Sequence, residues 1–233
     1  MQKKKKKLSH IGRQLITFTS PRSHVSEQYR TLRTNIKFSC PDRDYHSIVI
    51  TSASPGEGKS TTSANLAVVF AQEGKRVLII DGDMRKPTMH HTFNVPNTRG
   101  LSSVLTRQAI LKTAIKATKV ENLDILPCGP IPPNPAELLG SNSMDALIAQ
   151  LKEMYDLIIV DAPPILSVTD GQILANKCEG TILVINSGET QKEKAVKAKE
   201  LITQSKSRLI GAILNNFVIP RNSDYLVYYG DEN

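Results

Sequence analysis

Six short runs of aliphatic residues recur along the chain, and none of them alternates with polar positions. They are rich in Ile, Val and Leu and span residues 47–51, 77–80, 123–126, 157–160, 181–185 and 209–214. A strand covered on one face alternates apolar and polar side chains, whereas a strand covered on both faces is apolar throughout. The runs therefore predict strands of a sheet that is buried on both sides.

Segments with helical spacing lie between these strands. Apolar residues recur at intervals of three and four in residues 60–73, 143–154 and 192–204. Alternation of strands and helices predicts an α/β fold with a mostly parallel central sheet flanked by helices on both faces. The proline-rich residues 127–135 interrupt the pattern, and we expect a surface loop there.

The two ends of the chain differ in composition from its middle. At 233 residues the chain can bury one sizeable core. We expect a basic, flexible N-terminal segment of residues 1–25, a folded domain of residues 26–219 and a mobile C-terminal tail of residues 220–233. No apolar stretch is long enough to span a bilayer, and the start lacks the features of a secretory signal, so a soluble protein is expected.

Net charge and cysteine content limit the cellular compartments and the partners that are compatible with this chain. The formal net charge is +8, and much of it comes from the run Lys3 to Lys7. Such a run suits either a solvated tail or attraction to anionic lipid or another polyanion, and the sequence leaves both open. Cys40, Cys128 and Cys178 are far apart and form no C-x-x-C pair. This pattern argues against disulfides and a cysteine metal site and favours a reducing cytoplasm.

The strongest chemical signal lies between the first predicted strand and the first predicted helix. Residues 53–61 read Ala-Ser-Pro-Gly-Glu-Gly-Lys-Ser-Thr, with Ala53 where a P-loop normally begins with Gly. Its glycines let backbone N–H groups turn toward phosphates, Lys59 reaches the β- and γ-phosphates, and Ser60 offers a hydroxyl to Mg²⁺. The alternative interpretation is a purely structural glycine-rich turn that contains a lysine by chance. Such a turn does not require the Lys-Ser pair that follows the last glycine, so the pair favours the P-loop. The predicted nucleotide-binding residues here are Pro55, Gly56, Glu57, Gly58, Lys59, Ser60 and Thr61, with Thr61 near the α-phosphate.

Carboxylates follow two of the predicted strands. Asp81 and Asp83 come after the second strand, and Asp161 follows the run 157–160. Ligands of open α/β sheets bind at the carboxyl ends of the strands. One aspartate there can be a mere turn former or helix cap, but three beside a P-loop indicate a site for Mg-ATP. The predicted metal site is Ser60 and Asp83, which bind or position Mg²⁺, and Asp161, which orients a water in the metal shell.

These motifs together resemble Walker A, Walker A′ and Walker B of the bacterial tyrosine kinases (BY-kinases) that control capsule and exopolysaccharide synthesis. The second motif is Asp81-Gly82-Asp83-Met84-Arg85 and the third is Asp161-Ala162-Pro163-Pro164. The resemblance covers residues 26–230 and implies the P-loop NTPase fold of the deviant Walker A type. ParA/MinD-type ATPases share that fold, so the fold alone does not decide the function.

Two features before and within the P-loop favour the kinases. ParA/MinD-type ATPases carry a signature lysine five residues before the P-loop lysine, where this chain has Ser54. The kinases carry Glu-x-x-Arg-x-x-Arg before the first strand, which Glu27, Arg30 and Arg33 match. The resemblance implies a subunit contact in a ring-like homo-oligomer, whereas the spacing alone is also that of an exposed pair on one helix face.

The third feature is the tail, which contains Tyr225, Tyr228 and Tyr229. The resemblance implies that they are autophosphorylated in the active site of a neighbouring copy, whereas an exposed tail without function is the alternative. It also assigns catalysis to four side chains, with the first aspartate accepting or orienting the proton of the tyrosine hydroxyl. These catalytic residues are Lys59, Asp81, Asp83 and Asp161.

The same resemblance implies a cellular setting. This chain has no transmembrane sensor of the kind fused to the domain in one lineage, so a separate transmembrane activator is expected, with the protein cytoplasmic and peripheral at the inner face of the membrane. The cofactors are ATP and Mg²⁺, the substrates are protein tyrosines, and nucleic acid is not expected as a partner. The rivals are a ParA/MinD-type ATPase that switches dimerisation on DNA or membrane, which the basic N-terminus favours, and a regulatory module of feeble catalysis.

Adenine recognition is the least defined part of the predicted site. Asn215 and Asn216 close the last predicted strand at the same edge of the sheet. Their amides are able to read a purine ring, but both residues also suit a turn. Asn215 is our candidate for nucleotide binding.

Overall fold

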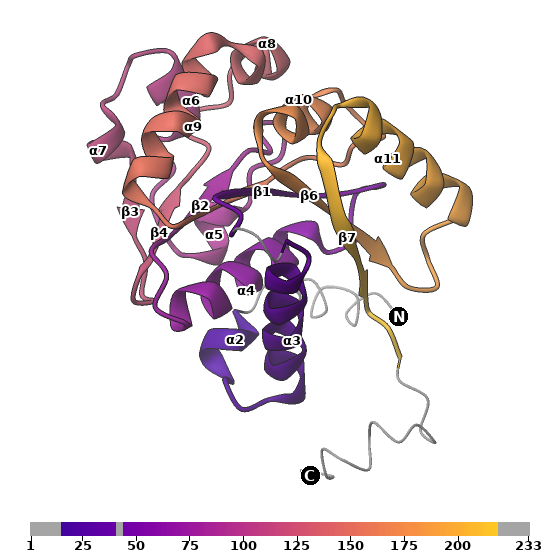
Figure 1. The fold of residues 1–233 in the computed structure, drawn as a ribbon. Coiled ribbons are helices and arrows are strands. Elements are labelled where there is room, and N and C mark those ends of the chain that lie inside the picture. The colour runs from indigo at the N-terminus through magenta and orange to yellow at the C-terminus, as the bar shows by residue number, and fades with distance from the viewer. Residues whose placement is uncertain (1–14, 41–43, 219–233) are drawn as a thin grey trace, which may run out of the picture.

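The computed structural model describes residues 15–40 and 44–218, and its centre is a seven-stranded sheet in the order β3-β4-β2-β5-β1-β6-β7 (Figure 1). Every neighbouring pair is parallel except β3 with β4. The predicted α/β architecture with a mostly parallel sheet is confirmed. The strands are β1 (Ser47–Ser52), β2 (Val77–Asp81), β3 (Lys116–Ala117), β4 (Leu123–Leu126), β5 (Leu157–Asp161), β6 (Gly180–Asn186) and β7 (Arg208–Asn215).

All six predicted strands are present, and their ends differ from the prediction by at most one residue. β1, β2 and β5 are buried along their whole length because helices cover both faces of the sheet. β7 is one of the two edge strands of the sheet and is largely exposed. β3 was missed because two residues paired antiparallel to β4 leave no apolar run to detect.

Of the four long helices among the described residues, three match the predicted periodic segments, and the fourth, at residues 24–38, was not among those segments. α4, α9 and α11 begin and end within one residue of the predicted bounds. The shorter helices were not predicted, because four to eight residues show too little periodicity. The helices are α2 (Ile16–Thr19), α3 (His24–Phe38), α4 (Lys59–Gln72), α5 (Met89–Thr92), α6 (Leu101–Leu105), α7 (Leu111–Ala114), α8 (Pro135–Gly140), α9 (Asn142–Met154), α10 (Asp170–Lys177) and α11 (Lys192–Gln204).

Two apolar cores lie on opposite faces of the sheet. Side chains alternate along β1, so Ile48 and Ile50 pack with α3 and α4, whereas Val49 packs with α9 and α10. Figure 1 shows these helix pairs on opposite sides of the sheet. Most of α4 is buried, which fixes the direction of the helix that follows the P-loop.

The folded part of the chain begins closer to the N-terminus than predicted. Thr17 of α2 is buried, and its backbone N–H and hydroxyl donate to Asn65 Oδ1 of α4 at 3.0 and 2.9 Å. α3 begins at His24, and the Ser23 hydroxyl accepts the Ser26 N–H as its N-cap. The predicted boundary at residue 25 therefore falls inside α3, and the domain extends further toward the N-terminus. Residues 1–14, with the lysine run, lie outside the described residues.

The proline-rich segment is only partly a surface loop. Pro127, Cys128 and Gly129 are buried. The carbonyl oxygens of Pro127 and Cys128 accept the N–H groups of Leu101 and Ser102, which ties this segment to the start of α6. Pro135 begins α8, since proline is tolerated in the first turn of a helix. The surface-loop prediction is thus corrected at both ends of the segment.

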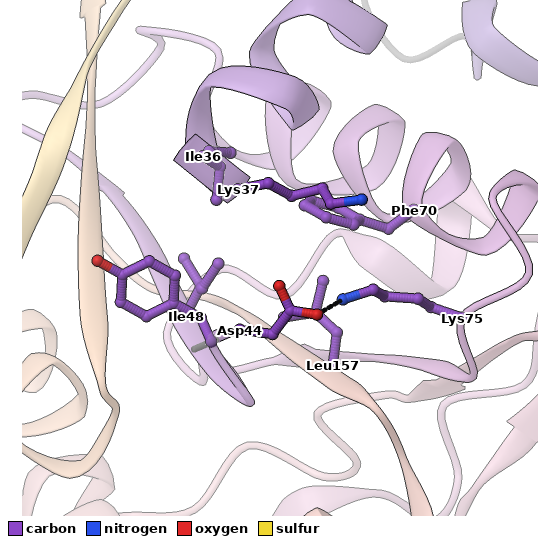
Figure 2. Close-up of a pocket in the computed structure, with 8 residues that line it drawn as sticks. Ile36, Lys37, Asp44, Ile48, Phe70, Lys75 and Leu157 are labelled. Atoms are coloured by element: carbon purple, nitrogen blue, oxygen red, sulfur yellow. Dashed lines mark hydrogen bonds and ion pairs between the residues drawn. The ribbon is translucent and has the colours of Figure 1, made fainter. Parts of the chain in front are cut away.

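A small cavity lies at the amino ends of β1 and β5. Figure 2 shows Asp44 accepting a hydrogen bond from Lys75 Nζ, at 2.6 Å, among apolar side chains that include Ile48 and Leu157. The cavity volume is about 10 Å³, which is close to the space that one water molecule requires. A ligand site must therefore lie elsewhere.

Candidate functional site

A large cavity opens at the carboxyl ends of the central strands. Its volume is about 930 Å³. The P-loop, the loops after β2 and β5, and the end of β7 contribute to its lining. Segments far apart in the sequence thus meet at the edge of the sheet where ligands of open α/β folds bind. The predicted residues that line it are Pro55, Gly56, Gly58, Lys59, Ser60, Thr61, Asp83 and Asn215.

The loop between β1 and α4 turns at two glycines. Gly56 and Gly58 have φ of 85° and 94°, in the left-handed region that glycine adopts readily. A Cβ at Gly58 would lie 2.0 Å from Asn215 Nδ2. Asn215 Nδ2 donates to the carbonyl oxygen of Glu57 at 3.0 Å. Glycine is therefore required at position 58, and the last strand braces the P-loop.

Asn215 and Asn216 differ in what they do. Both line the cavity. Asn216 has φ of 56°, and its Nδ2 donates to Asn186 Oδ1 at 2.9 Å, so the turn-former interpretation describes it. Asn215 lines the site and holds the P-loop backbone through Glu57. Its proposed contact with adenine remains a prediction.

Lys59 lies between two carboxylates. Its Nζ is 3.0 Å from Asp83 Oδ2 and 3.6 Å from Asp161 Oδ2. Burial lowers the pKa of Lys59, but the charges of Asp161 and Asp83 outweigh it and hold the pKa above its ordinary value. The lysine is therefore charged at neutral pH, and its charge offsets the aspartates.

Asp161 is completely buried at the end of β5. It accepts the hydroxyl of Ser60 at 2.7 Å and that of Ser63 at 3.1 Å. Burial raises the pKa of Asp161, whereas Lys59 and the two hydroxyls oppose that rise. Ser63 was not predicted, although its spacing of three from Ser60 places both on one face of α4.

Asp83 faces the cavity, and Asp81 lies behind it. Asp83 Oδ1 accepts the backbone N–H of Lys86 at 3.0 Å, while Oδ2 accepts Lys59. Asp81 is fully buried and does not line the cavity. Its Oδ2 accepts the N–H groups of Thr88 and Met89, both at 3.0 Å.

The other carboxylate oxygen of Asp81, Oδ1, is buried and has no hydrogen-bond partner among the described residues. Burial, followed by the charge of Asp161, raises the pKa of Asp81 to about 8. A carboxyl group with a raised pKa and a vacant oxygen is able to exchange a proton near neutral pH.

One wall of the cavity was not anticipated from the sequence. Ile16 of α2 and Val25 and Tyr29 of α3 line it, because α2 and α3 pack against α4 beside the P-loop. No motif placed these apolar residues near the phosphates. Pro163 and Pro164, which belong to the third motif, also line the cavity.

The residues predicted for subunit contact lie on α3. Arg30 Nη1 is 2.7 Å from Glu27 Oε2, and Arg30 also donates to the carbonyl oxygen of Pro21. Arg33 Nη1 donates to the carbonyl oxygen of Val69 on α4 at 2.7 Å. Arg33 is thus engaged within the chain, while the Glu27 and Arg30 side chains are 43% and 31% exposed.

The tyrosines divide into two groups. Tyr29, Tyr45 and Tyr155 belong to the cores, and none is more than 9% exposed. The predicted phosphorylation sites Tyr225, Tyr228 and Tyr229 lie outside the described residues. The six tyrosines of the chain are therefore three buried ones and three in the tail sequence.

The sequence and fold are similar to those of known tyrosine kinases. A family model described as AAA domain matches residues 45–193. The tyrosine-protein kinase YwqD of Bacillus subtilis (strain 168) is 53% identical over 230 residues, covering 99% of this chain and 97% of that protein. The kinase domain of Escherichia coli tyrosine kinase ETK has a TM-score of 0.85 at 33% identity, covering 90% of this chain and 82% of that chain.

The rival ATPase group is similar at a lower level. The cell division ATPase MinD of Pyrococcus furiosus has a TM-score of 0.64 at 27% identity, covering 77% of this chain and 74% of that chain. The MinD-like fold prediction is therefore confirmed. As an alternative function, the ParA/MinD-type switch has less support than the kinase.

Proposed function

The chain belongs to the bacterial tyrosine-protein kinases, and we propose that it transfers the γ-phosphoryl group of ATP to tyrosines in the tail of a neighbouring copy. The arrangement around Lys59 supports this proposal most directly. The ammonium group of Lys59, in the P-loop itself, lies within 3.6 Å of two strand-end carboxylates. Phosphoryl transfer requires mainly such positioning and charge compensation.

The proposed nucleotide contacts follow from the loop. Backbone N–H groups around Gly56 and Gly58 and at the start of α4 donate to the phosphates. When the nucleotide binds, the ammonium group of Lys59 loses part of its contact with the aspartates and binds the β- and γ-phosphates instead. Thr61 lies toward the α-phosphate. The brace from Asn215 to Glu57 keeps the loop in the turned form that these contacts need.

The site also fits a magnesium ion that arrives with the nucleotide. Within the described residues, no three His, Cys, Asp or Glu side chains are arranged to hold a metal by themselves. Mg²⁺ is commonly held by one or two carboxylates together with substrate phosphates and waters. Ser60, Asp83 and Asp161 supply one hydroxyl and two carboxylates within hydrogen-bonding range of Lys59 or each other. When bound, Mg²⁺ neutralises phosphate charge and polarises the transferred group.

Asp81 is the proposed proton acceptor. A phenol has a reference pKa of about 10, so a carboxylate assists by orienting the hydroxyl and accepting its proton late in transfer. The unpartnered Oδ1 supports this role. The two N–H groups on Oδ2 hold the carboxyl group in place and join it to Thr88, which lines the cavity.

The burial of the other tyrosines supports the tail as the target. A tyrosine must enter the site with its hydroxyl free, and Tyr29, Tyr45 and Tyr155 are packed in the cores. Tyr155 in addition donates its hydroxyl to Asp124 at 2.8 Å. Tyr225, Tyr228 and Tyr229 are the remaining tyrosines of the sequence.

Phosphotyrosine formation tests this function. The full chain, supplied with labelled ATP, magnesium and the cytoplasmic segment of its activator, is expected to gain phosphate on the tail. A chain with Tyr225→Phe, Tyr228→Phe and Tyr229→Phe is expected to lose more than about nine tenths of the label, because its other tyrosines are buried. Mass spectrometry of the labelled chain measures both results. Free phosphate without labelled protein would instead favour the ATPase.

The proposal includes a ring-like assembly. Glu27 and Arg30 are exposed enough to contact another copy, and Arg33 lies on the same helix. Each phosphotyrosine adds about 1.5 to 2 negative charges, so a modified tail is repelled from a site that holds three aspartates. Native mass measurement is expected to give a smaller assembly after phosphorylation. An Arg30→Glu chain is expected to remain small throughout, and an assembly that is unchanged in both cases would contradict this contact.

The cellular setting completes the proposal. Capsule or exopolysaccharide synthesis is the proposed process, and a separate transmembrane protein is the proposed activator, both carried by the family resemblance. In the part of the chain that the structure describes, no helix is suited to crossing a membrane. Recruitment by the activator would place the kinase at the inner face of the membrane.

A further inference from the structure

Four charged residues line the cavity, and one of them has no counter-charge. Lys59 pairs with Asp83, and Arg85 directs both Nε and Nη2 to the buried Asp170, at 2.9 and 3.0 Å. Lys86 is exposed and belongs to none of the ion pairs among the described residues. Its side chain is therefore available to a partner from outside.

The backbone places Lys86 beside the reacting groups. The N–H of Lys86 donates to Asp83 Oδ1 at 3.0 Å, so the lysine starts within the loop that carries Asp83. Because a lysine side chain extends roughly 6 Å from its Cα, the ammonium group reaches the rim of the cavity. Substitution of the side chain leaves this backbone hydrogen bond in place.

An acidic substrate needs a cation at this rim. Asp83 and Asp161 outnumber Lys59 at the centre of the site, and ATP brings further negative charge. A peptide with carboxylates next to its tyrosine would be repelled there unless a nearby positive charge offset the repulsion.

The tail sequence places acids beside the proposed target tyrosines. Asp224 directly precedes Tyr225, and Asp231 and Glu232 follow Tyr229 by two and three residues. An extended chain advances roughly 3.3 Å per residue, so an acid one or two positions from a tyrosine lies roughly 3 to 7 Å from it along the backbone. That separation is comparable with the reach of Lys86.

We propose that Lys86 binds the carboxylate next to the target tyrosine, so that the site selects tyrosines in acidic peptides, first of all the tail of a neighbouring copy. The inference rests on the proposed function and names its substrate class. Other protein substrates are then expected to carry Asp or Glu within about two residues of the modified tyrosine.

Steady-state kinetics with two peptides test the proposal. One peptide has the sequence of residues 219–233, and the other carries Asp224→Asn, Asp231→Asn and Glu232→Gln. The enzymes are the full native chain, Lys86→Glu and, as a matched control, Lys197→Glu on the exposed face of α11. KM for the peptide and KM for ATP are measured separately for each enzyme.

Lys86→Glu is expected to raise KM for the acidic peptide about threefold to tenfold, because a surface attraction becomes a repulsion. The amide peptide is expected to have a raised KM with the native chain and no further rise with Lys86→Glu. Lys197→Glu is expected to change neither constant. The difference between the peptides is expected to shrink in high salt.

Two results would overturn the inference. Equal KM values for both peptides with the native chain would show that the acids are not recognised. A rise in KM for ATP alone in Lys86→Glu would assign the lysine to the nucleotide phosphates. If the native chain phosphorylated neither peptide nor its own tail, the proposed function itself would fail.

Discussion

A Lys59→Met chain is expected to form no detectable phosphotyrosine, a loss of about a thousandfold or more. Methionine keeps an unbranched side chain of similar length but removes the cation that lies 3.0 Å from Asp83 and 3.6 Å from Asp161. The nucleotide phosphates would then meet these carboxylates without compensation. Label transfer to the tail, measured at saturating ATP, checks the result.

A matched control separates this effect from a general loss of a lysine. Lys75 pairs with Asp44 at 2.6 Å at the small cavity of Figure 2, away from the P-loop. Lys75→Met is expected to keep near-native activity, since a surface ion pair contributes about 0 to 1 kcal/mol. Tail labelling by Lys59→Met at more than about a tenth of the native rate would remove the lysine from the mechanism.

An Asp81→Asn chain is expected to lose about a hundredfold to ten-thousandfold in phosphotyrosine formation, the usual contribution of a general base. Asparagine still accepts the N–H groups of Thr88 and Met89 at its amide oxygen. The local structure is therefore retained, but no proton acceptor remains. The alternative is that Asp81 only holds residues 88 and 89 in place. In that case the rate of phosphotyrosine formation by the native chain, measured against pH, would show no step near the pKa of Asp81.

The same substitution is expected to stabilise the free protein at alkaline pH. Because the pKa of Asp81 is raised to about 8 in the folded chain and is near 3.8 when unfolded, its contribution to stability is present at low pH. That contribution is lost as the pH rises through about 8. Asparagine has no charge to bury, so its advantage grows with pH.

Urea unfolding measures this advantage. Between about pH 6 and about pH 9 the Asp81→Asn chain is expected to gain up to about 3 kcal/mol over the native chain. Asp145→Asn is the control, because Asp145 is exposed and pairs with Lys177 on the surface. A gain that did not change with pH would mean that Asp81 is not a protonated buried acid in the free chain.

The fold was largely predictable because its central elements repeat a strong local pattern. β1, β2 and β5 are apolar throughout and lie in the middle of the sheet, where burial on both faces leaves no polar position. α2 escaped prediction because four residues cannot show a helical period. Its position depends on tertiary hydrogen bonds from Thr17 to Asn65, which have no sequence signature.

The sequence predicted those site residues that combine a side chain suited to nucleotide binding with a position in the P-loop or at the end of a strand. Lys59, Asp83 and Asp161 stand at a P-loop or a strand end, and parallel topology brings such ends together. The sequence could not indicate that Asp81 lies behind the cavity, or that Asn215 braces the P-loop, because both follow from side-chain packing across the sheet edge. The roles assigned to these residues remain predictions.

Burial of Tyr45 and Tyr155, away from the large cavity, has a consequence for an enzyme that modifies tyrosine side chains. A correctly folded copy offers its neighbours no phenol inside the cores, so the fold protects the kinase from damage by its own reaction. The charge of a phosphate on Tyr155 would be incompatible with the apolar packing and with Asp124 beside it. Phosphate on Tyr45 or Tyr155 would thus mark molecules that were modified before folding or after unfolding.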